Sequence, residues 1–186
     1  MSVNKQKVLR ITGLLLVFLL LLTPLGFYTK IQLLRLWSAP PDNEAGGQLT
    51  QRQYQSWFLK DDSGNLLSFD QFERKVVFVN FWATWCAPCV AEMPSLQALY
   101  EQYGRKVHFV SIAKDDPKAV KQFLEKNPYT FPVYFLGNSP PELLHAHDIP
   151  VTYILDRNAR IALQNTGAAD WNTTVVHQML DSLTTP

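Results

Sequence analysis

The stretch VVFVNFWATWCAPC (Val76–Cys89) decides the fold of this chain of 186 residues. Its first half is an apolar, partly β-branched run with little alternation, which is typical of a strand buried on both faces. Its second half ends in Cys-x-x-Cys. The residues that follow have the spacing of one helix face: Leu96, Leu99, Tyr100 and Tyr103. The two cysteines are therefore predicted to lie where a buried strand passes into the N-terminus of a helix.

This position predicts different roles for the two cysteines. The free N–H groups of a first helical turn, together with the helix dipole, favour an anion, so we expect Cys86 to ionise readily to the thiolate. A thiolate can attack a disulfide and form a mixed disulfide. Cys89, one turn further along, can then displace the bound partner. The pattern predicts redox chemistry with Cys86 attacking and Cys89 resolving.

Two other uses of the cysteine pair agree less well with the sequence. A structural disulfide across so short a loop removes little entropy from the unfolded chain. A zinc site needs about four ligands, and the closely spaced histidines, His145 and His147, do not have the usual finger spacing. We therefore favour redox chemistry and expect no metal site.

The segment Phe81–Cys89 resembles the active-site segment of thioredoxin-fold proteins. Asn80 before it and Glu92–Pro94 after it resemble the membrane-anchored TlpA/ResA-like branch of that fold. The resemblance covers about residues 58–183. It implies an α/β thioredoxin-like fold, in which a central mixed sheet is flanked by helices and preceded by an N-terminal hairpin extension.

The rest of the chain has patterns that agree with this order of elements. Strands and helices alternate after the Cys-x-x-Cys helix, which favours parallel pairing and right-handed crossovers. The expected elements are a hairpin at 58–67, the strand at 76–82, its helix to 103, a strand at 107–112, a helix at 117–126, a strand at 131–136, a short helix at 142–147, a hairpin at 152–164 and a last helix at 175–183.

A substrate groove is expected beside the cysteines. In thioredoxin-fold proteins the proline that matches Pro150 is cis and packs against the Cys-x-x-Cys motif. The resemblance implies that Pro150 shapes the groove and leaves the backbone of Ile149 free to pair with an extended substrate. Further substrate contacts are expected from Trp85, which flanks Cys86, and from Pro88. An ordinary turn proline before an edge strand is the competing interpretation of Pro150.

A proton acceptor for the resolving cysteine is also expected. Cytoplasmic-type thioredoxins have a buried aspartate where this chain has Asn80, which cannot ionise. Glu92 lies three residues after Cys89, on the same side of the next helical turn. A partly buried carboxylate there could have a raised pKa and accept the proton of Cys89, and TlpA/ResA-like proteins carry a glutamate at this position. The alternative is that Glu92 is only a favourable charge near the helix start.

The N-terminal part of the chain differs from the rest. Residues 1–10 are polar and basic, whereas residues 11–28 are almost wholly apolar. A helix of that length reaches roughly 27 Å, close to the thickness of a bilayer's hydrocarbon core. We expect an uncleaved transmembrane signal-anchor, with a cleaved signal peptide as the alternative. Residues 29–48 are expected to form a juxtamembrane linker. Its segment Ile31–Trp37 either lies along the interface, with Trp37 as an anchor, or continues the anchor helix. The thioredoxin-like domain is expected to span 49–186.

Charge and cysteine content indicate the compartment. The excess of positive charge before the apolar segment favours a cytoplasmic N-terminus and a periplasmic or equivalent extracytoplasmic catalytic domain. The net charge of +1 offers no electrostatic case for binding nucleic acid. Both cysteines lie in the motif, so the chain has no third thiol that could mispair in an oxidising compartment.

These features predict a membrane-anchored extracytoplasmic thiol:disulfide oxidoreductase that needs no cofactor beyond the Cys86–Cys89 pair. The resemblance implies exported disulfide-bearing proteins as substrates, a membrane electron donor of the DsbD/CcdA type, and reduction of apocytochrome c during cytochrome c maturation. Membrane lipid is expected to contact the N-terminal helix. A net oxidant or isomerase, and a metal-binding chaperone using the two cysteines, remain as alternatives.

Overall fold

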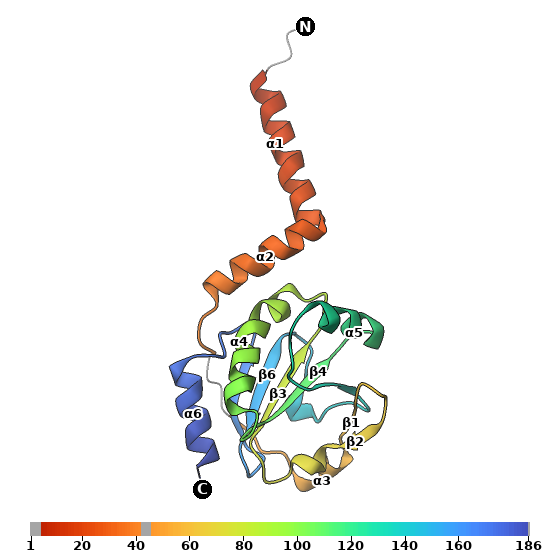
Figure 1. The fold of residues 1–186 in the computed structure, drawn as a ribbon, viewed down its shortest axis with the longest axis vertical. Helices are drawn as coiled ribbons and strands as arrows, with labels where there is room; N and C mark the ends of the chain where they lie inside the picture. Colours follow the sequence, from red (N-terminus) through yellow and green to blue (C-terminus); the bar gives the residue numbers. More distant parts are fainter. Residues whose placement is uncertain (1–4, 42–45, 186) are drawn as a thin grey trace.

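The described residues after the N-terminal helices fold around a seven-stranded mixed sheet (Figure 1). The computed structural model describes residues 5–41 and 46–185. The strand order is β2-β1-β5-β4-β3-β6-β7. The strands are β1 (Phe58–Lys60), β2 (Leu66–Ser68), β3 (Val77–Trp82), β4 (His108–Ala113), β5 (Val133–Leu136), β6 (Val151–Leu155) and β7 (Ile161–Thr166).

The central strand is β3, and all six of its residues are buried, as the apolar run predicts. It pairs in parallel with β4 and antiparallel with β6. The predicted N-terminal hairpin is the antiparallel pair β1–β2, and β1 extends the sheet by pairing with β5. The thioredoxin-like α/β fold is confirmed.

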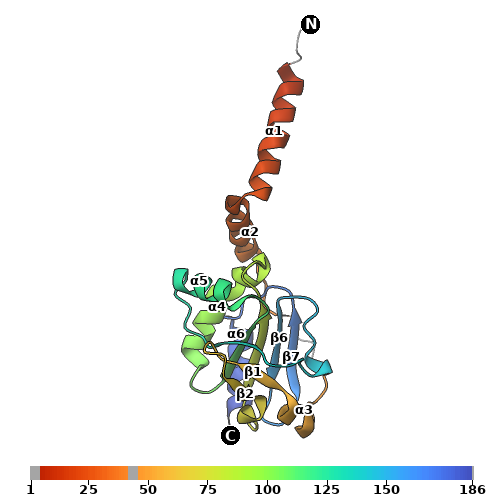
Figure 2. The same cartoon turned by 90° about the vertical axis from the view of Figure 1, so that its right-hand side faces the viewer.

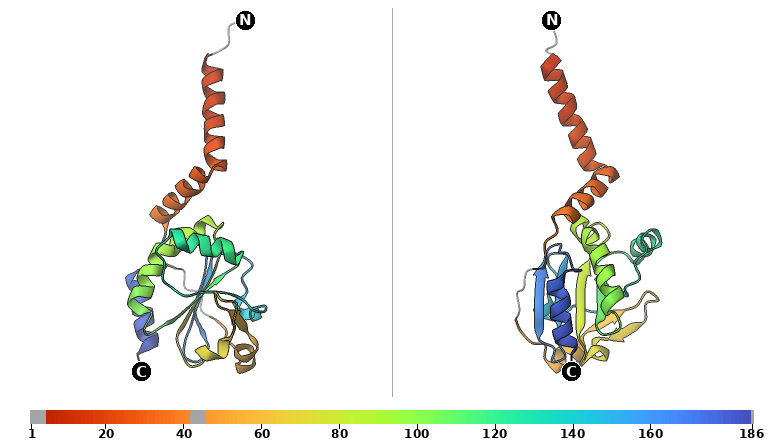
Figure 3. Two further views of the ribbon diagram at one scale, coloured as in Figure 1. Left: turned by 45° about the vertical axis from the view of Figure 1, so that its right-hand side comes forward. Right: turned by 60° about the vertical axis from the view of Figure 1, so that its left-hand side comes forward.

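Helices cover both faces of this sheet. They are α3 (Gln51–Ser56), α4 (Ala87–Tyr103), α5 (Pro117–Lys126) and α6 (Thr174–Thr184), with short 3-10 turns η1 (Phe69–Phe72) and η2 (Glu142–Leu144). Figure 3 shows α4 and α6 on the same face of the sheet. The Tyr103 hydroxyl joins these two helices, because it donates to the His177 carbonyl and lies 3.1 Å from the Asp181 carboxylate.

The alternation of β3 divides its side chains between two cores. Val77, Val79 and Phe81 belong to the core on the side of α3 and η1. Phe78 and Trp82 belong to the core on the side of α4 and α6. Because side chains alternate along a strand, Asn80 faces α4, the helix that begins at the cysteines.

The N-terminal segment forms two helices, α1 (Lys5–Leu22) and α2 (Pro24–Trp37). Pro24 separates them, because it has no N–H to donate and disfavours helical backbone at the preceding residue; Thr23 is accordingly extended, with φ −89° and ψ 160°. The apolar segment predicted over 11–28 is therefore divided at Thr23. Within the described residues, no helix combines the length and the apolar character that crossing a membrane requires.

The helix α2 packs on the start of α4, and Figures 1 and 2 both show it there. Ile31 is 2% exposed and lies in one cluster with Val90 and Ala91. Pro94 inside α4 leaves the carbonyl of Val90 without its usual helical donor, and the Arg35 Nη2 atom donates to that carbonyl at 3.5 Å. The N-terminal segment is thus attached to the active-site helix.

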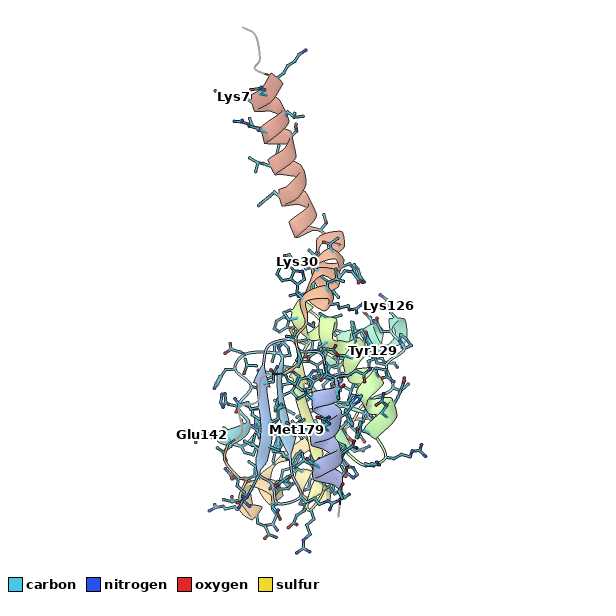
Figure 4. The ribbon with its side chains drawn as sticks, turned by 90° about the vertical axis from the view of Figure 1, so that its left-hand side faces the viewer. Lys7, Lys30, Lys126, Tyr129, Glu142 and Met179 are labelled. Atoms are coloured by element: carbon cyan, nitrogen blue, oxygen red, sulfur yellow. A yellow bond between two sulfur atoms is a disulfide. The ribbon has the colours of Figure 1, made fainter. Side chains whose placement is uncertain are left out.

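The opposite face of α2 is exposed and includes Leu33, Leu36 and Trp37. Figure 4 shows Lys30 on α2, with Tyr129 below it on the segment that follows α5. The predicted linker, 29–48, thus contains the second half of α2, and its described residues from Ser38 on, 38–41 and 46–48, form no helix. Part of this linker, 42–45, lies outside the described residues, as does the beginning, 1–4, of the predicted cytoplasmic segment.

Candidate active site

The two cysteines lie at the junction of β3 and α4 and are joined by a disulfide. Cys86 is the N-cap residue of α4, and its sulfur accepts a hydrogen bond from the Cys89 N–H at 3.2 Å. Pro88 lies in the first turn, where a residue without an N–H costs the helix no hydrogen bond. The predicted passage from a buried strand through Cys-x-x-Cys into a helix is confirmed.

The two cysteines differ in exposure. Cys86 is 5% exposed and Cys89 is fully buried. Trp85, immediately before Cys86, is 64% exposed and offers a large apolar surface next to the disulfide. The sulfur that an incoming protein can reach first therefore belongs to Cys86.

The loop before β6 reaches the disulfide from the other side. The Ile149–Pro150 peptide bond is cis. The carbonyl oxygen of Ile149 lies 3.7 Å from the Cys86 sulfur. Since a disulfide sulfur carries no hydrogen, this is a van der Waals contact in the oxidised protein. The structure thus places Ile149 and Pro150 beside Cys86, where the sequence predicts a substrate groove.

Glu92 is buried behind the cysteines, with 1% of its surface exposed. Its Oε1 atom accepts a hydrogen bond from Asn80 Nδ2 at 2.9 Å. Its Oε2 atom accepts from Trp171 Nε1 at 3.0 Å and from the Ala169 N–H at 3.3 Å. Burial raises the pKa of Glu92 to about 7, although each of these hydrogen bonds favours the charged form and acts in the opposite direction.

A carboxyl group with a pKa near neutrality exchanges a proton readily at physiological pH. Glu92 follows Cys89 by three residues on α4, so the two side chains lie on neighbouring turns of the same helix face. Asn80 also donates to Thr152 Oγ1 at 2.9 Å, which anchors its amide to β6. The arrangement provides a dithiol–disulfide pair with a buried carboxyl group one turn away on the same helix.

Sequence reasoning missed several residues of this site. Trp171 and Ala169 come from the loop between β7 and α6, 79 and 77 residues after Glu92. The loop before Cys86 is held by Asp115, which accepts hydrogen bonds from the backbone N–H and the hydroxyl of Thr84. No periodic pattern marks these residues; the one signal in the sequence is the tryptophan itself, whose large apolar ring favours burial.

The described residues contain no group of three or more histidine, cysteine or acidic side chains arranged to hold a metal ion. The rings of His145 and His147 lie 5.7 Å apart. Both histidines are exposed.

Comparison with known proteins identifies relatives that are named as thiol-disulfide oxidoreductases. Residues 50–164 match the model of the AhpC/TSA family. The chain is 30% identical over 162 residues to thiol-disulfide oxidoreductase ResA of Geobacillus thermodenitrificans. The match covers 81% of this chain and 84% of that protein. It is 34% identical over 146 residues to thioredoxin-like protein YneN of Bacillus subtilis, covering 76% and 84% of the two chains.

Solved structures are similar in fold. StoA from Bacillus subtilis superposes with a TM-score of 0.51 at 23% identity, over 67% of this chain and 92% of StoA. A DsbF homologue from Corynebacterium diphtheriae gives a TM-score of 0.57 at 22% identity, over 78% and 99% of the two chains. At these identities the likeness concerns the fold alone.

Proposed function

Because the chain belongs to the AhpC/TSA family and is a thiol-disulfide oxidoreductase of the ResA type, we propose that it reduces disulfides of exported proteins at the outer face of the plasma membrane. The observation that carries this proposal is the redox pair itself: Cys86 at the N-terminus of α4, Cys89 buried behind it, and Glu92 on the next turn.

The reaction begins when the protein is in its dithiol form. The Cys86 thiolate attacks one sulfur of a substrate disulfide; a Cys86–substrate disulfide forms and the other substrate sulfur leaves as a thiolate. Cys89 then transfers its proton to Glu92 and attacks the Cys86 sulfur. The Cys86–Cys89 disulfide forms, the second substrate thiolate leaves, and two electrons have passed from the protein to the substrate.

The helix N-terminus makes Cys86 the better nucleophile of the two. The free N–H groups of the first turn stabilise a negative charge on its sulfur, as the hydrogen bond from the Cys89 N–H illustrates. Cys89 has no such position, because it lies inside α4 and is fully buried. It therefore depends on Glu92, whose pKa of about 7 lets the carboxylate accept a proton at neutral pH.

The substrate binds across the face that carries Cys86. Trp85 and Pro88 provide an apolar surface on the side of α4, and Ile149 and Pro150 border Cys86 on the side of β6. An extended peptide that pairs with the backbone at Ile149 brings its disulfide to the exposed edge of Cys86.

The proposal includes a membrane anchor formed by the N-terminal segment. The first 41 residues contain five lysines and arginines and no acidic residue. Their apolar stretch, 11–28, is preceded by three of these cations, which favours a cytoplasmic N-terminus. The exposed Leu36 and Trp37 at the end of α2 suit contact with lipid at the interface.

A reductant in an oxidising compartment must be re-reduced after each turnover. We therefore extend the proposal to a membrane thiol donor of the DsbD/CcdA type, and to apocytochrome c as a substrate, whose paired cysteines must be reduced before haem attachment. The second candidate, a net oxidant or isomerase, is separated by the reduction potential of the Cys86–Cys89 pair. A value well below about −200 mV supports the reductant, and one near −120 mV supports the oxidant.

Trapping the natural partner tests the function directly. In full-length Cys89→Ser, the mixed disulfide on Cys86 has no resolving thiol, so a covalent complex with substrate should accumulate and be released by a thiol reductant. The matched control, Cys86→Ser with Cys89 intact, should form no such complex. If neither variant holds a partner, or both hold the same set equally, the proposed roles of the cysteines are wrong.

A further inference from the structure

The two oxygens of the Glu92 carboxylate have different surroundings. Oε2 accepts two hydrogen bonds, from the Trp171 indole and from the Ala169 backbone. Oε1 accepts one, from Asn80. A carboxylate oxygen offers two lone pairs. Both lone pairs of Oε2 are therefore engaged, whereas Oε1 keeps one acceptor position for a proton.

The indole of Trp171 is held in place at several points. Its side chain is fully buried, and its ring packs on the Phe78 ring in a T-shaped arrangement at a centroid distance of 5.0 Å. Its backbone N–H donates to Ser95 Oγ at 3.1 Å, and that hydroxyl donates to the Glu92 carbonyl at 2.8 Å. Trp171 is thus linked to Glu92 through both its side chain and its backbone.

The loop that carries Trp171 is also tied to the N-terminal segment. The N–H of Asp170 donates to the carbonyl of Ala39 at 2.9 Å. Asp170 stands between Ala169 and Trp171, the two loop residues that donate hydrogen bonds to Glu92. The two donors therefore belong to a loop that is fixed on one side by α4 and on the other by the segment after α2.

We propose that Trp171 is a positioning residue for the proton transfer between Cys89 and Glu92. By occupying Oε2 together with the Ala169 N–H, it directs the proton to Oε1. In the transfer the S–H bond of Cys89 breaks and an O–H bond forms at Oε1, which leaves Cys89 as the attacking thiolate. The Trp171 hydrogen bond also stabilises the carboxylate, so it sets the pH above which Glu92 can act as the acceptor. This inference rests on the role of Glu92 in the proposed function.

The groups that face the carboxylate make its titration simple to interpret. From β3 it meets the amide of Asn80, and from the β7–α6 loop an indole and a backbone N–H. On α4 itself, Cys89 precedes Glu92 by one turn. The causes of its raised pKa are burial and these hydrogen bonds, with no contribution from a neighbouring charge. In the oxidised protein Cys89 does not titrate, so Glu92 is the titrating group of this pocket.

The test compares full-length wild type with Trp171→Phe in two measurements. The first is the titration of Glu92 in the oxidised protein, followed by the infrared band of its protonated carboxyl group, which Glu92→Gln identifies by its loss. Removal of one hydrogen bond to a charged group should move the midpoint of the Glu92 titration upward by about 1 on the pH scale.

The second measurement is a single turnover with 5,5′-dithiobis(2-nitrobenzoate). Attack by Cys86 releases the first thionitrobenzoate, and resolution by Cys89 releases the second. At pH 7 the second phase should slow about fivefold in Trp171→Phe, and its pH midpoint should move with that of Glu92.

Two further variants separate the hydrogen bond from packing. Phe78→Leu removes the ring contact of Trp171 but leaves the indole N–H, and should keep the Glu92 midpoint of the wild type. Replacement of Trp171 with 3-benzothienylalanine keeps the ring shape without the N–H, and should reproduce the shift of Trp171→Phe. If the benzothienyl variant titrates like the wild type, Trp171 acts only through packing and the proposal is overturned. If Glu92→Gln leaves the second phase and its pH profile unchanged, the role of Glu92 in the proposed function fails instead, whatever the infrared titration shows.

Discussion

Glu92→Gln should remove the part of the pH dependence of the oxidised protein's stability, between pH 4.5 and 8, that the Glu92 carboxyl group contributes. Glu92 is 1% exposed, and burial raises its pKa to about 7 from an ordinary value of 4.5. A carboxyl group whose pKa is raised by folding holds its proton more tightly in the folded protein. Its contribution to stability is therefore complete below about pH 4.5 and is lost as the pH rises to and through 7.

The size of this effect follows from the two pKa values. They differ by about 2.5, and a difference of one in pKa corresponds to about 1.4 kcal/mol, so ionising the buried carboxyl costs about 3 kcal/mol of folding stability by pH 8. That is a large part of the stability of an ordinary domain, which is about 5 to 15 kcal/mol. The wild type should accordingly unfold at clearly lower denaturant concentration at pH 8 than at pH 4.5.

The Glu92→Gln variant can keep the hydrogen bonds of the pocket, but its side-chain amide does not ionise. Its side-chain oxygen can accept from Trp171 and Ala169, and its NH₂ group then faces Asn80. The Asn80 amide can turn so that its oxygen accepts from the new NH₂ group and from the hydroxyl of Thr152. The variant should therefore fold, and its stability should change with pH less than that of the wild type.

The assay is urea unfolding of the oxidised full chain, with one mild detergent used for both proteins, at several pH values between 4.5 and 8. Subtraction of the variant's free energy of unfolding from that of the wild type removes the contribution of the other titrating groups. The difference should fall by about 3 kcal/mol from pH 4.5 to pH 8. If the free energies of unfolding of the two proteins change with pH in parallel, Glu92 has an ordinary pKa in the folded state. The proposed role of Glu92 as proton acceptor would then be contradicted.

Two further predictions concern surfaces beside the site. Trp85→Ala should raise the KM for a protein disulfide several-fold and leave the thermal unfolding temperature unchanged, because the indole is 64% exposed; an unchanged KM would remove Trp85 from the substrate surface. Ile31→Ala should weaken the packing of α2 on α4 by about 2 kcal/mol, because Ile31 is 2% exposed. The weaker packing should appear as faster tryptic cleavage of Ile31→Ala after Lys30 and Arg35. If Ile31→Ala is cleaved at the wild-type rate, α2 is not stably docked on α4.

Local patterns in the sequence were sufficient for the core of the fold and for the redox pair. The apolar run before Cys86 predicts a strand buried on both faces, because a buried environment on each side selects apolar residues without alternation. The helical spacing after Cys-x-x-Cys predicts that α4 begins at the cysteines. The hairpin β1–β2 and the start of α5 at Pro117 were predictable for the same reason, since turns and caps depend on residues close together in the chain.

The N-terminal segment shows where such reasoning stops. Composition predicts an apolar segment over 11–28, but the break at Thr23 depends on a single proline, whose effect on a helix varies with its neighbours. The docking of α2 was not predicted at all. Ile31 has the character of an interfacial residue when the segment is considered alone, and its burial against Val90 arises from a helix 56 residues further along the chain.

The sequence by itself determined that a Cys-x-x-Cys pair would begin a helix after a buried strand, and that Glu92 would follow Cys89 on the same helix face. Both follow from backbone periodicity, which relates residues only a few positions apart. Only the tertiary structure decided what meets these groups: the Ile149 carbonyl beside Cys86, and Trp171 and Ala169 on one oxygen of Glu92. The order of β3, β6 and β7 in the sheet brings these distant loops to the start of α4, and no local pattern records which strands become neighbours.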